Sequence, residues 1–314
     1  MKLGIALVLA VALPATAYSQ FTEWSPPTNV GPPVNTTVAE LAPFISKDGL
    51  TLYFGRGALA NALDIWVSQR ASIDAPWETP QNLGPTVNTV GIDNGPALSP
   101  DEHSLYFNSN RSGGSGGNDL YVTRRHDKRN PLGWGTPANL GGSVNSSVED
   151  TSPTFFEDEA TGVTTMYFDS NRPGQGDFDI YASTILPDGT FTPAVPVDEL
   201  SSSFSDRGPV VRRDGLEMYL QSNRPGPGRV ADIDLMVSTR ATTSDPWSTP
   251  VYLGSIVNTR FIDAAPALSF DGTALYFHST RNSPDATGPC VPDLGPCVFD
   301  LYVTTRAKLK GPHE

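Results

Sequence analysis

Short runs of alternating hydrophobic and polar positions recur along most of this chain. The string DLYVTRR at 119–125 returns with small changes as DIWVSQR at 64–70, DIYASTI at 179–185, DLMVSTR at 234–240 and DLYVTTR at 300–306. Each copy is rich in β-branched and aromatic residues, is bounded by turn-forming residues, and lacks the period of an amphipathic helix. The pattern predicts five related β-strands.

The other features of the chain recur with the same period. An aromatic residue marks each of five units at spacings of 53, 57, 57 and 56 residues: Trp24, Trp77, Trp134, Phe191 and Trp247. Four units then carry Val-Asn, and all five carry an acid three residues before a proline, a turn, a strand of the LYF type and an arginine. A fixed period of this size is the signature of a repeat architecture.

Each unit contains four short β-type runs, and a four-stranded antiparallel meander repeated around an axis is a propeller blade. Five contiguous copies over residues 21–308 leave no room for a sixth, so we predict an all-β, five-bladed β-propeller. The small apolar run at 96–100 suits the crowded innermost strand. The chain then begins with an outermost strand, and residues 22–30 are expected to join 300–306 and close the last blade.

The segment SPDEHSLYFNSNRSGGSGGNDLYVTRR at 99–125 resembles the PD40, or WD40-like (TolB-like), β-propeller repeat of exported bacterial proteins. The hallmark of that family is a unit of the form sPDG-x-x-Lyf-x-S-x-R followed by DiYv. The resemblance covers all five repeats, although the unit at 191 lacks the Trp and the Val-Asn. It implies a propeller that serves as a protein-binding module of the bacterial envelope.

Residues 1–19 have the composition of a secretory signal peptide. Lys2 precedes an apolar run from Leu3 to Leu13, and small residues at 15, 17 and 19 suit cleavage. The run is too short to span a membrane, and no later segment is apolar enough to do so. We therefore expect an exported protein, periplasmic or extracellular. Export permits a disulfide between Cys290 and Cys297, which we expect to close a local loop.

Composition narrows the partners further. The 314 residues carry a formal charge of -13, which repels the phosphate backbone and argues against nucleic acid. The 29 glycines and 29 prolines suit a turn-rich β protein. We expect a monomer without a cofactor, apart from a divalent cation such as calcium at the acids described next.

One acid per unit precedes the predicted innermost strand. Two interpretations stay open for these residues: a ring of carboxylates that binds a ligand or a cation at the mouth of the channel, or acids that cap a turn and pair with arginine. Because every unit carries one, we favour the second interpretation, since acid–base catalysis needs carboxylates in unlike surroundings. The acids are Glu40, Asp93, Asp150, Asp206 and Asp263.

Three further series occur in all five units, and we expect them to be structural. An arginine fork can hold a carboxylate and loop carbonyls together. The arginines are Arg56, Arg111, Arg172, Arg224 and Arg281, and the aspartates that open the third strand are Asp64, Asp119, Asp179, Asp234 and Asp300. The tyrosines of the second strand and the Trp series are expected to pack between blades: Tyr53, Tyr106, Tyr167, Tyr219 and Tyr276.

No catalytic residue or metal site is assigned from these patterns. GGSGG at 113–117 does not lie on a strand-to-helix elbow, the four histidines are scattered, and DFD at 177–179 and DID at 232–234 lack a calcium loop. We therefore predict a non-enzymatic binding or scaffold protein whose loop-rich face recognises a protein, peptide or glycan. The alternative is a propeller glycoside hydrolase that uses the channel-mouth carboxylates, among which Glu40 is the only glutamate.

Overall fold

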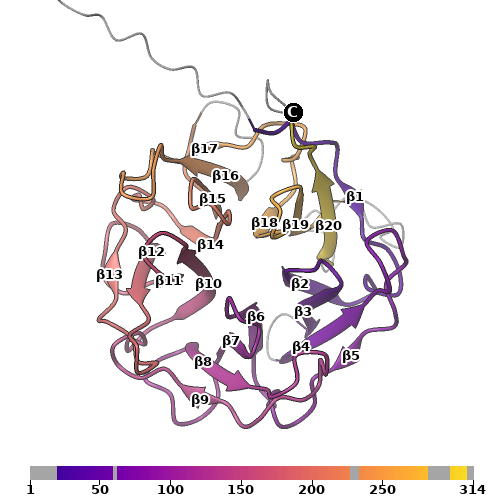
Figure 1. The fold of residues 1–314 in the computed structure, drawn as a ribbon, viewed down its shortest axis with the longest axis vertical. Helices are drawn as coiled ribbons and strands as arrows, with labels where there is room; N and C mark the ends of the chain where they lie inside the picture. Colours follow the sequence, from indigo (N-terminus) through magenta and orange to yellow (C-terminus); the bar gives the residue numbers. More distant parts are fainter. Residues whose placement is uncertain (1–19, 59–61, 227–232, 282–297, 310–314) are drawn as a thin grey trace, which may run out of the picture.

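The structure, a computed structural model, describes residues 20–58, 62–226, 233–281 and 298–309. Five four-stranded antiparallel sheets surround a central axis, as Figure 1 shows, and the predicted five-bladed propeller is confirmed. The described residues contain no helix, and so none of them forms a helix that could cross a membrane.

The strands follow the predicted order from the axis outward. Blade 1 contains β2 (Ala39–Ile45), β3 (Thr51–Ala58), β4 (Ala62–Gln69) and β5 (Gln81–Asn82). Blade 2 contains β6 (Asp93–Leu98), β7 (Ser104–Ser109), β8 (Asp119–Arg124) and β9 (Ala138–Asn139). Blade 3 contains β10 (Asp150–Asp158), β11 (Val163–Ser170), β12 (Asp179–Thr184) and β13 (Val195–Pro196).

Blade 4 contains β14 (Asp206–Val211), β15 (Glu217–Ser222), β16 (Asp234–Thr239) and β17 (Val251–Tyr252). Blade 5 contains β18 (Asp263–Leu268), β19 (Ala274–Ser279), β20 (Asp300–Thr305) and β1 (Thr28–Asn29). We call the side of the ring that carries the turns between first and second strands the hairpin face. The opposite side, where the chain enters each first strand, is the loop face.

The two ends of the chain close the ring, as predicted. β1 pairs with β20 through Thr28 opposite Val303 and Asn29 opposite Tyr302, and an isolated bridge joins Phe21 to Lys308. Figure 1 shows the indigo segment beside the yellow strand of blade 5. Because each blade contacts only its neighbours, this pairing is what converts a row of blades into a closed ring.

Aromatic side chains fill each seam between blades, which confirms the packing role predicted for the Tyr and Trp series. Tyr53 of blade 1 meets Trp134 of blade 2 edge to face, with ring centroids 6.3 Å apart, and Tyr219 meets Trp24 in the same way at 6.0 Å. The other three seams repeat the pairing within their core clusters. Tertiary burial of these rings therefore holds one blade to the next.

A second stacking series escaped the sequence analysis, although its arginine is the last letter of four of the recurring strings. The guanidinium carbon lies 4.2–4.5 Å from a tryptophan ring centroid in four blades. The pairs are Arg70–Trp77, Arg125–Trp134, Arg240–Trp247 and Arg306–Trp24. Such cation–π contacts add to the packing of the seam.

The first strand of every blade has an irregularity at the predicted acid-x-x-Pro segment. In all five blades, the pairing register of the first and second strands shifts between the residue that follows the acid and the residue that follows the proline. The residue before each proline has a positive φ: Ala42 at 44°, Gly95 at 62°, Ser152 at 54°, Gly208 at 60° and Ala265 at 48°. Three of these are not glycine, and neighbouring groups must compensate for a conformation that L-residues rarely adopt.

Candidate functional site

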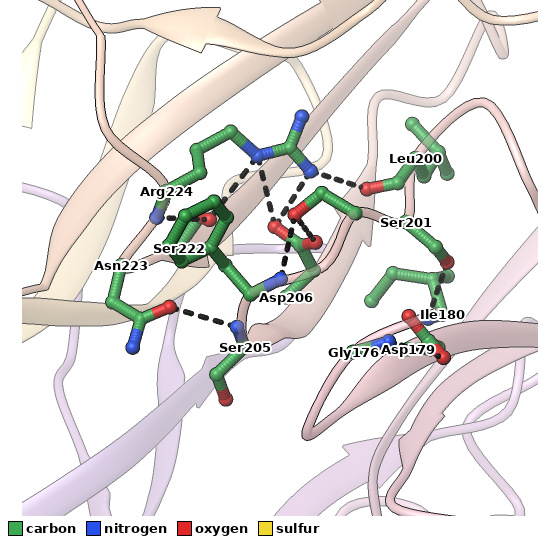
Figure 2. A network of polar contacts seen from close by, with 12 residues as sticks. Gly176, Asp179, Ile180, Leu200, Ser201, Ser205, Asp206, Ser222, Asn223 and Arg224 are labelled. Atoms are coloured by element: carbon green, nitrogen blue, oxygen red, sulfur yellow. Dashed lines mark hydrogen bonds and ion pairs between the residues drawn. The ribbon is translucent and has the colours of Figure 1, made fainter. Parts of the chain in front are cut away.

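The five predicted channel-mouth acids are completely buried, and each is paired with the arginine of its own unit. In Figure 2, Arg224 Nη2 donates to Asp206 Oδ1 at 2.6 Å and to the carbonyl oxygen of Leu200 at 2.7 Å. Arg224 Nε also donates to Ser222 Oγ at 3.2 Å. The guanidinium thus joins the start of the first strand, the end of the second strand and the loop that precedes the blade.

The same arrangement recurs around the ring. The acid–arginine pairs are Glu40–Arg56 at 2.9 Å, Asp93–Arg111 at 2.6 Å, Asp150–Arg172 at 2.5 Å, Asp206–Arg224 at 2.6 Å and Asp263–Arg281. A Thr or Ser four residues before each acid also donates its hydroxyl to the carboxylate. In blades 2–5 it bonds the oxygen that the arginine does not, whereas in blade 1 Thr36 and Arg56 both bond Glu40 Oε1. Burial raises the pKa of Glu40.

We call these five acids the ring acids. Their contacts occupy the carboxylate oxygens that a ligand or a cation would need. All five have no exposed side-chain area, and their arginines are only 10–20% exposed. A ligand or cation would have to displace an arginine that would then be buried without a partner, which is costly. Ligand binding by these acids stays a prediction.

The Val-Asn motif joins a blade to the loop that follows it. Asn145 donates from Nδ2 to the carbonyl oxygen of Leu120 at 3.0 Å and accepts the Leu120 N–H at 2.8 Å. Asn35, Asn88 and Asn258 make the same two bonds at equivalent strands. The unit without Val-Asn uses Ser201 Oγ, which accepts the Ile180 N–H at 3.1 Å.

Four of the aspartates that open the third strand are buried, and the fifth, Asp64, is half-buried. Asp119 Oδ2 accepts from Asn139 Nδ2 at 2.9 Å, and Asp64 and Asp300 accept from the matching asparagines, Asn82 and Asn29. Asp179 instead accepts the Gln175 N–H at 2.7 Å, and burial raises its pKa. Asp234 is also buried, at the start of β16.

Three further predictions concern a metal site, a disulfide and a signal peptide. Within 20–58, 62–226, 233–281 and 298–309, no group of three or more His, Cys, Asp or Glu side chains is placed to hold a metal ion. Cys290, Cys297 and the leader at 1–19 lie outside the described residues, as does Asp232 of DID at 232–234. The disulfide, the signal peptide and the cation stay predictions.

Directly after the ring acids, the five blades differ. The residue that follows each acid and its partner on the second strand form five cross-strand pairs, which we call the variable ring. The pairs are Leu41–Gly55, Asn94–Asn108, Thr151–Asp169, Arg207–Gln221 and Ala264–His278. Sequence reasoning missed these residues. The signal was present, because they are positions at which otherwise constant repeats disagree.

Side chains of the variable ring cross to the next blade. Asp169 Oδ1 accepts the Gly208 N–H at 2.9 Å, Gln221 Oε1 accepts the Ala265 N–H at 2.7 Å, and His278 Nδ1 accepts the Ala42 N–H at 3.2 Å. The donors are the backbone N–H groups of the positive-φ residues in the first-strand bulges. These bonds satisfy backbone donors that the bulge removes from the ladder.

The variable ring holds one ion pair and one histidine. Arg207 Nε donates to Asp169 Oδ2 at 3.2 Å and Arg207 Nη2 to Thr151 Oγ1 at 3.1 Å, while the guanidinium stacks on Phe178 at 3.6 Å from the ring centroid. Burial and the nearby Arg207 charge lower the pKa of His278 to about 3. His278 is therefore a neutral imidazole at physiological pH, with Nδ1 as acceptor and Nε2–H as donor.

A cavity of about 220 Å³ lies on the axis at the hairpin face. All five blades line it, and its apolar wall includes Phe44, Phe155 and Phe270. Deeper along the axis, a space of about 60 Å³ is lined by the five first-strand prolines, so the channel narrows there. The prediction placed the ligand at the loop face, whereas this cavity opens at the opposite end. We call it the hairpin-face cavity.

Blade 3 breaks the symmetry of the hairpin-face cavity. Its first hairpin is longer than the others, with β10 and β11 paired out to Asp158 opposite Val163, and it brings Glu157 and Glu159 to the rim. Glu102 of blade 2 also lines the cavity and accepts the Lys47 N–H at 2.8 Å. Glu159 pairs with Arg213 at 2.6 Å. Carboxylates from two blades therefore face one cavity in unlike surroundings.

No protein-family profile matches the chain, and no curated protein sequence matches it. Solved structures share its fold. An α-L-arabinofuranosidase from Lactobacillus brevis is 20% identical with a TM-score of 0.56, and covers 85% of this chain and 90% of its own. The catalytic domain of the Coprinopsis cinerea GH62 α-L-arabinofuranosidase is 15% identical with a TM-score of 0.57, and covers 91% and 98%.

TolB from Acinetobacter baumannii also aligns, at 12% identity and a TM-score of 0.48 over 86% of this chain and 55% of its own. The PD40 resemblance is borne out only as far as the five-bladed propeller of four-stranded sheets. The prediction of a non-enzymatic scaffold was wrong. The finding that overturns it is the predominance of family-43 and GH62 glycoside hydrolases among the similar structures.

Proposed function

We propose that this chain is a glycoside hydrolase and that the hairpin-face cavity is the place of reaction. The observation that carries the proposal is the cavity itself, where Glu102 and Glu157 come from different blades to one aromatic-lined space on the axis. The fold shared with arabinofuranosidases supports the same class of reaction, by analogy of fold.

Hydrolysis of a glycosidic bond uses two carboxyl groups, one to protonate the leaving oxygen and one to activate water or to attack the sugar. The completely buried ring acids cannot reach a substrate in this structure. Glu102 is fixed by the Lys47 N–H, and we assign it the role of base. Glu157 is exposed and makes no ion pair with any described residue, and we assign it the role of proton donor.

The walls of the cavity suit a sugar. Phe44, Phe155 and Phe270 offer apolar surface to the C–H face of a pyranose or furanose ring. Lys47 and Arg213 flank the Phe270 ring, with Lys47 Nζ at 4.9 Å and the Arg213 guanidinium carbon at 4.5 Å from its centroid. Their donors can bond sugar hydroxyls at the rim.

The test is a panel of aryl glycosides and plant and bacterial oligosaccharides, assayed with native protein, Glu102→Gln and Glu157→Gln. We expect turnover by the native protein and a loss of about 10²–10⁴-fold in kcat for each variant. Glu159→Gln is the matched control, because Glu159 lies on the same hairpin but is 69% exposed and paired with Arg213. It should keep near-native activity.

Two results would contradict this proposal. One is folded native protein that turns over nothing on the panel. The other is full activity in both cavity variants with activity lost in a folded Glu40→Gln variant, which would move the reaction to the ring acids.

We also propose that the chain is exported and that its five units descend from a PD40-type repeat. The leader at 1–19 supports export. The descent is supported by the same acid, LYF strand, arginine and DLYV strand in each of the five blades. Detection of the mature chain from about residue 20 in the periplasm or medium would test export.

A further inference from the structure

A second cavity adjoins the hairpin-face cavity. Its volume is about 480 Å³, against about 220 Å³ for the hairpin-face cavity, and we call it the outer cavity. It is lined by the first hairpins of blades 3, 4 and 5 and by both ends of the described chain, among them Phe21, Ala160, Asp214, Asp271 and Lys308. The reaction assigned to the hairpin-face cavity gives this larger space no role.

The two cavities share a wall. Five residues line both of them: Phe156, Glu157, Glu159, Arg213 and Phe270. At the junction, Arg213 Nη2 pairs with Glu159 Oε1 at 2.6 Å, and the two side chains are 53% and 69% exposed. Exposed ion pairs of this kind contribute little to stability. A ligand can therefore extend from one cavity to the other without breaking a buried contact.

Groups that can bond sugar hydroxyls are spaced along this path. Lys47 lines only the hairpin-face cavity, Lys308 lines only the outer cavity, and Arg213 lines both. Glu157 also lines both cavities, and it is exposed. Because a hydroxyl group both donates and accepts hydrogen bonds, these cationic and carboxylate side chains can bond successive sugars of one chain.

The charges of the outer cavity disfavour an acidic ligand. Its acids are Glu157, Asp158, Glu159, Asp214 and Asp271. Its basic residues are Arg212, Arg213 and Lys308, which leaves an excess of two negative charges. Arg212 is already bonded to two carboxylates, Asp214 at 2.7 Å and Glu217 at 2.6 Å. A uronate or a sulfated sugar would therefore be repelled, whereas an uncharged sugar would not.

We propose that the hairpin-face cavity and the outer cavity form one cleft for an uncharged oligosaccharide, rather than a pocket for a single sugar. The sugar at the bond to be cleaved occupies the hairpin-face cavity, and further sugars cross the Arg213 junction into the outer cavity. The position of the cleaved bond rests on the proposed hydrolase function, whereas the binding of an oligosaccharide across both cavities can be tested without turnover.

Binding is measured by ¹H–¹⁵N NMR on the full chain with Glu102→Gln, in which the glutamine keeps an acceptor for the Lys47 N–H and hydrolysis does not consume the probe. The probes are xylohexaose, arabinohexaose and cellohexaose, each beside its monosaccharide. At least one hexasaccharide should bind at least tenfold more tightly than its monosaccharide. It should shift the backbone amides of Ser99 in the hairpin-face cavity and of Ala160 and Asp271 in the outer cavity. A hexamer of galacturonic acid should bind at least tenfold more weakly.

A tryptophan at position 160 tests the outer cavity directly. Ala160 lies in the exposed turn of the first hairpin of blade 3 and lines only the outer cavity. Ala160→Trp should weaken the best hexasaccharide at least tenfold and leave its monosaccharide unchanged. Ala71→Trp is the matched control, because Ala71 is also exposed and lines neither cavity. If Ala160→Trp does not fold, the positions of the amides shifted in Glu102→Gln still decide.

The proposal is overturned if no hexasaccharide binds more tightly than its monosaccharide, if the shifts are confined to the hairpin-face cavity, or if folded Ala160→Trp binds the hexasaccharide as tightly as Ala71→Trp. Equal affinity for the galacturonic acid hexamer would also overturn it. Hexasaccharide binding across both cavities without turnover by the native protein would support the cleft and contradict the hydrolase function. Turnover with shifts confined to the hairpin-face cavity would do the reverse.

Discussion

Two neighbouring positions of the first strand show opposite behaviour. The ring acid is always buried and always paired with an arginine, whereas the residue after it is leucine, asparagine, threonine, arginine or alanine. Every blade must hold its first strand to the preceding loop, so the first position is a buried acid in all five blades. The second position faces the neighbouring blade and the channel, where each seam can differ. In this propeller, repetition indicates architecture and departure from repetition indicates chemistry.

The two ends of the channel extend this comparison. At the hairpin face, the longer β10–β11 turn supplies Glu157 and Glu159 to one side of a cavity. At the loop face, Arg207 and His278 break the symmetry of the ring. The candidate catalytic carboxylates come from blades 2 and 3, where these blades depart from the common unit, and a catalytic pair needs such unlike surroundings.

The largest effect is expected at the ring acids. Asp150→Ala leaves the Arg172 guanidinium without its carboxylate, and the free energy of unfolding should fall by about 3–5 kcal/mol. Urea denaturation measures the loss. Asp127→Ala removes an exposed partner of Arg129 and should cause no measurable change. A loss below about 1 kcal/mol in Asp150→Ala would show that the ring acids are not structural.

The variable ring should affect the pH dependence of stability. The pKa of His278 is about 3 in the folded protein, against an ordinary histidine pKa of about 6.5. Between these values the unfolded chain binds the proton and the folded chain does not, so this contribution to stability is present above pH 6.5 and is lost as the pH falls toward 3. The slope is at most about 1.4 kcal/mol per pH unit.

His278→Gln keeps an acceptor for the Ala42 N–H and removes the titrating group. Its free energy of unfolding should therefore fall less than that of the native protein between pH 6 and pH 4. Urea denaturation at several pH values measures both slopes. Equal slopes for the two proteins would contradict a neutral His278 in the folded protein.

The smallest effect is expected at Asn94. Its Oδ1 is buried and has no hydrogen-bond partner, and it occupies the space beside Gly55 where the other blades carry a side chain. Asn94→Ala should change the free energy of unfolding by less than about 0.5 kcal/mol, or increase it. Asn145→Ala is the matched comparison, because it removes two buried backbone bonds and should cost about 2–3 kcal/mol. Equal costs would contradict this distinction.

Much of the fold could be predicted from the sequence because its signals are local and repeated. The spacing of Trp24, Trp77 and Trp134 indicates the blade, and the short run before β1 indicates how the ring closes. The candidate sites were harder. In the sequence, His278 is one of four scattered histidines, and Glu157 lies in a segment whose residues indicate only a turn.

The sequence by itself determined the number of blades, the order of strands and the pairing of the two ends, since the periodic burial of apolar side chains is encoded within each unit. Only the tertiary structure decided which polar groups bond to other residues of the propeller and which remain available to a ligand. Asp206 meets Arg224 18 residues away, whereas Asp169 meets Arg207 on the next blade, 38 residues away. Such contacts depend on the bulge of the first strand and on a neighbouring sheet, and no local pattern specifies either.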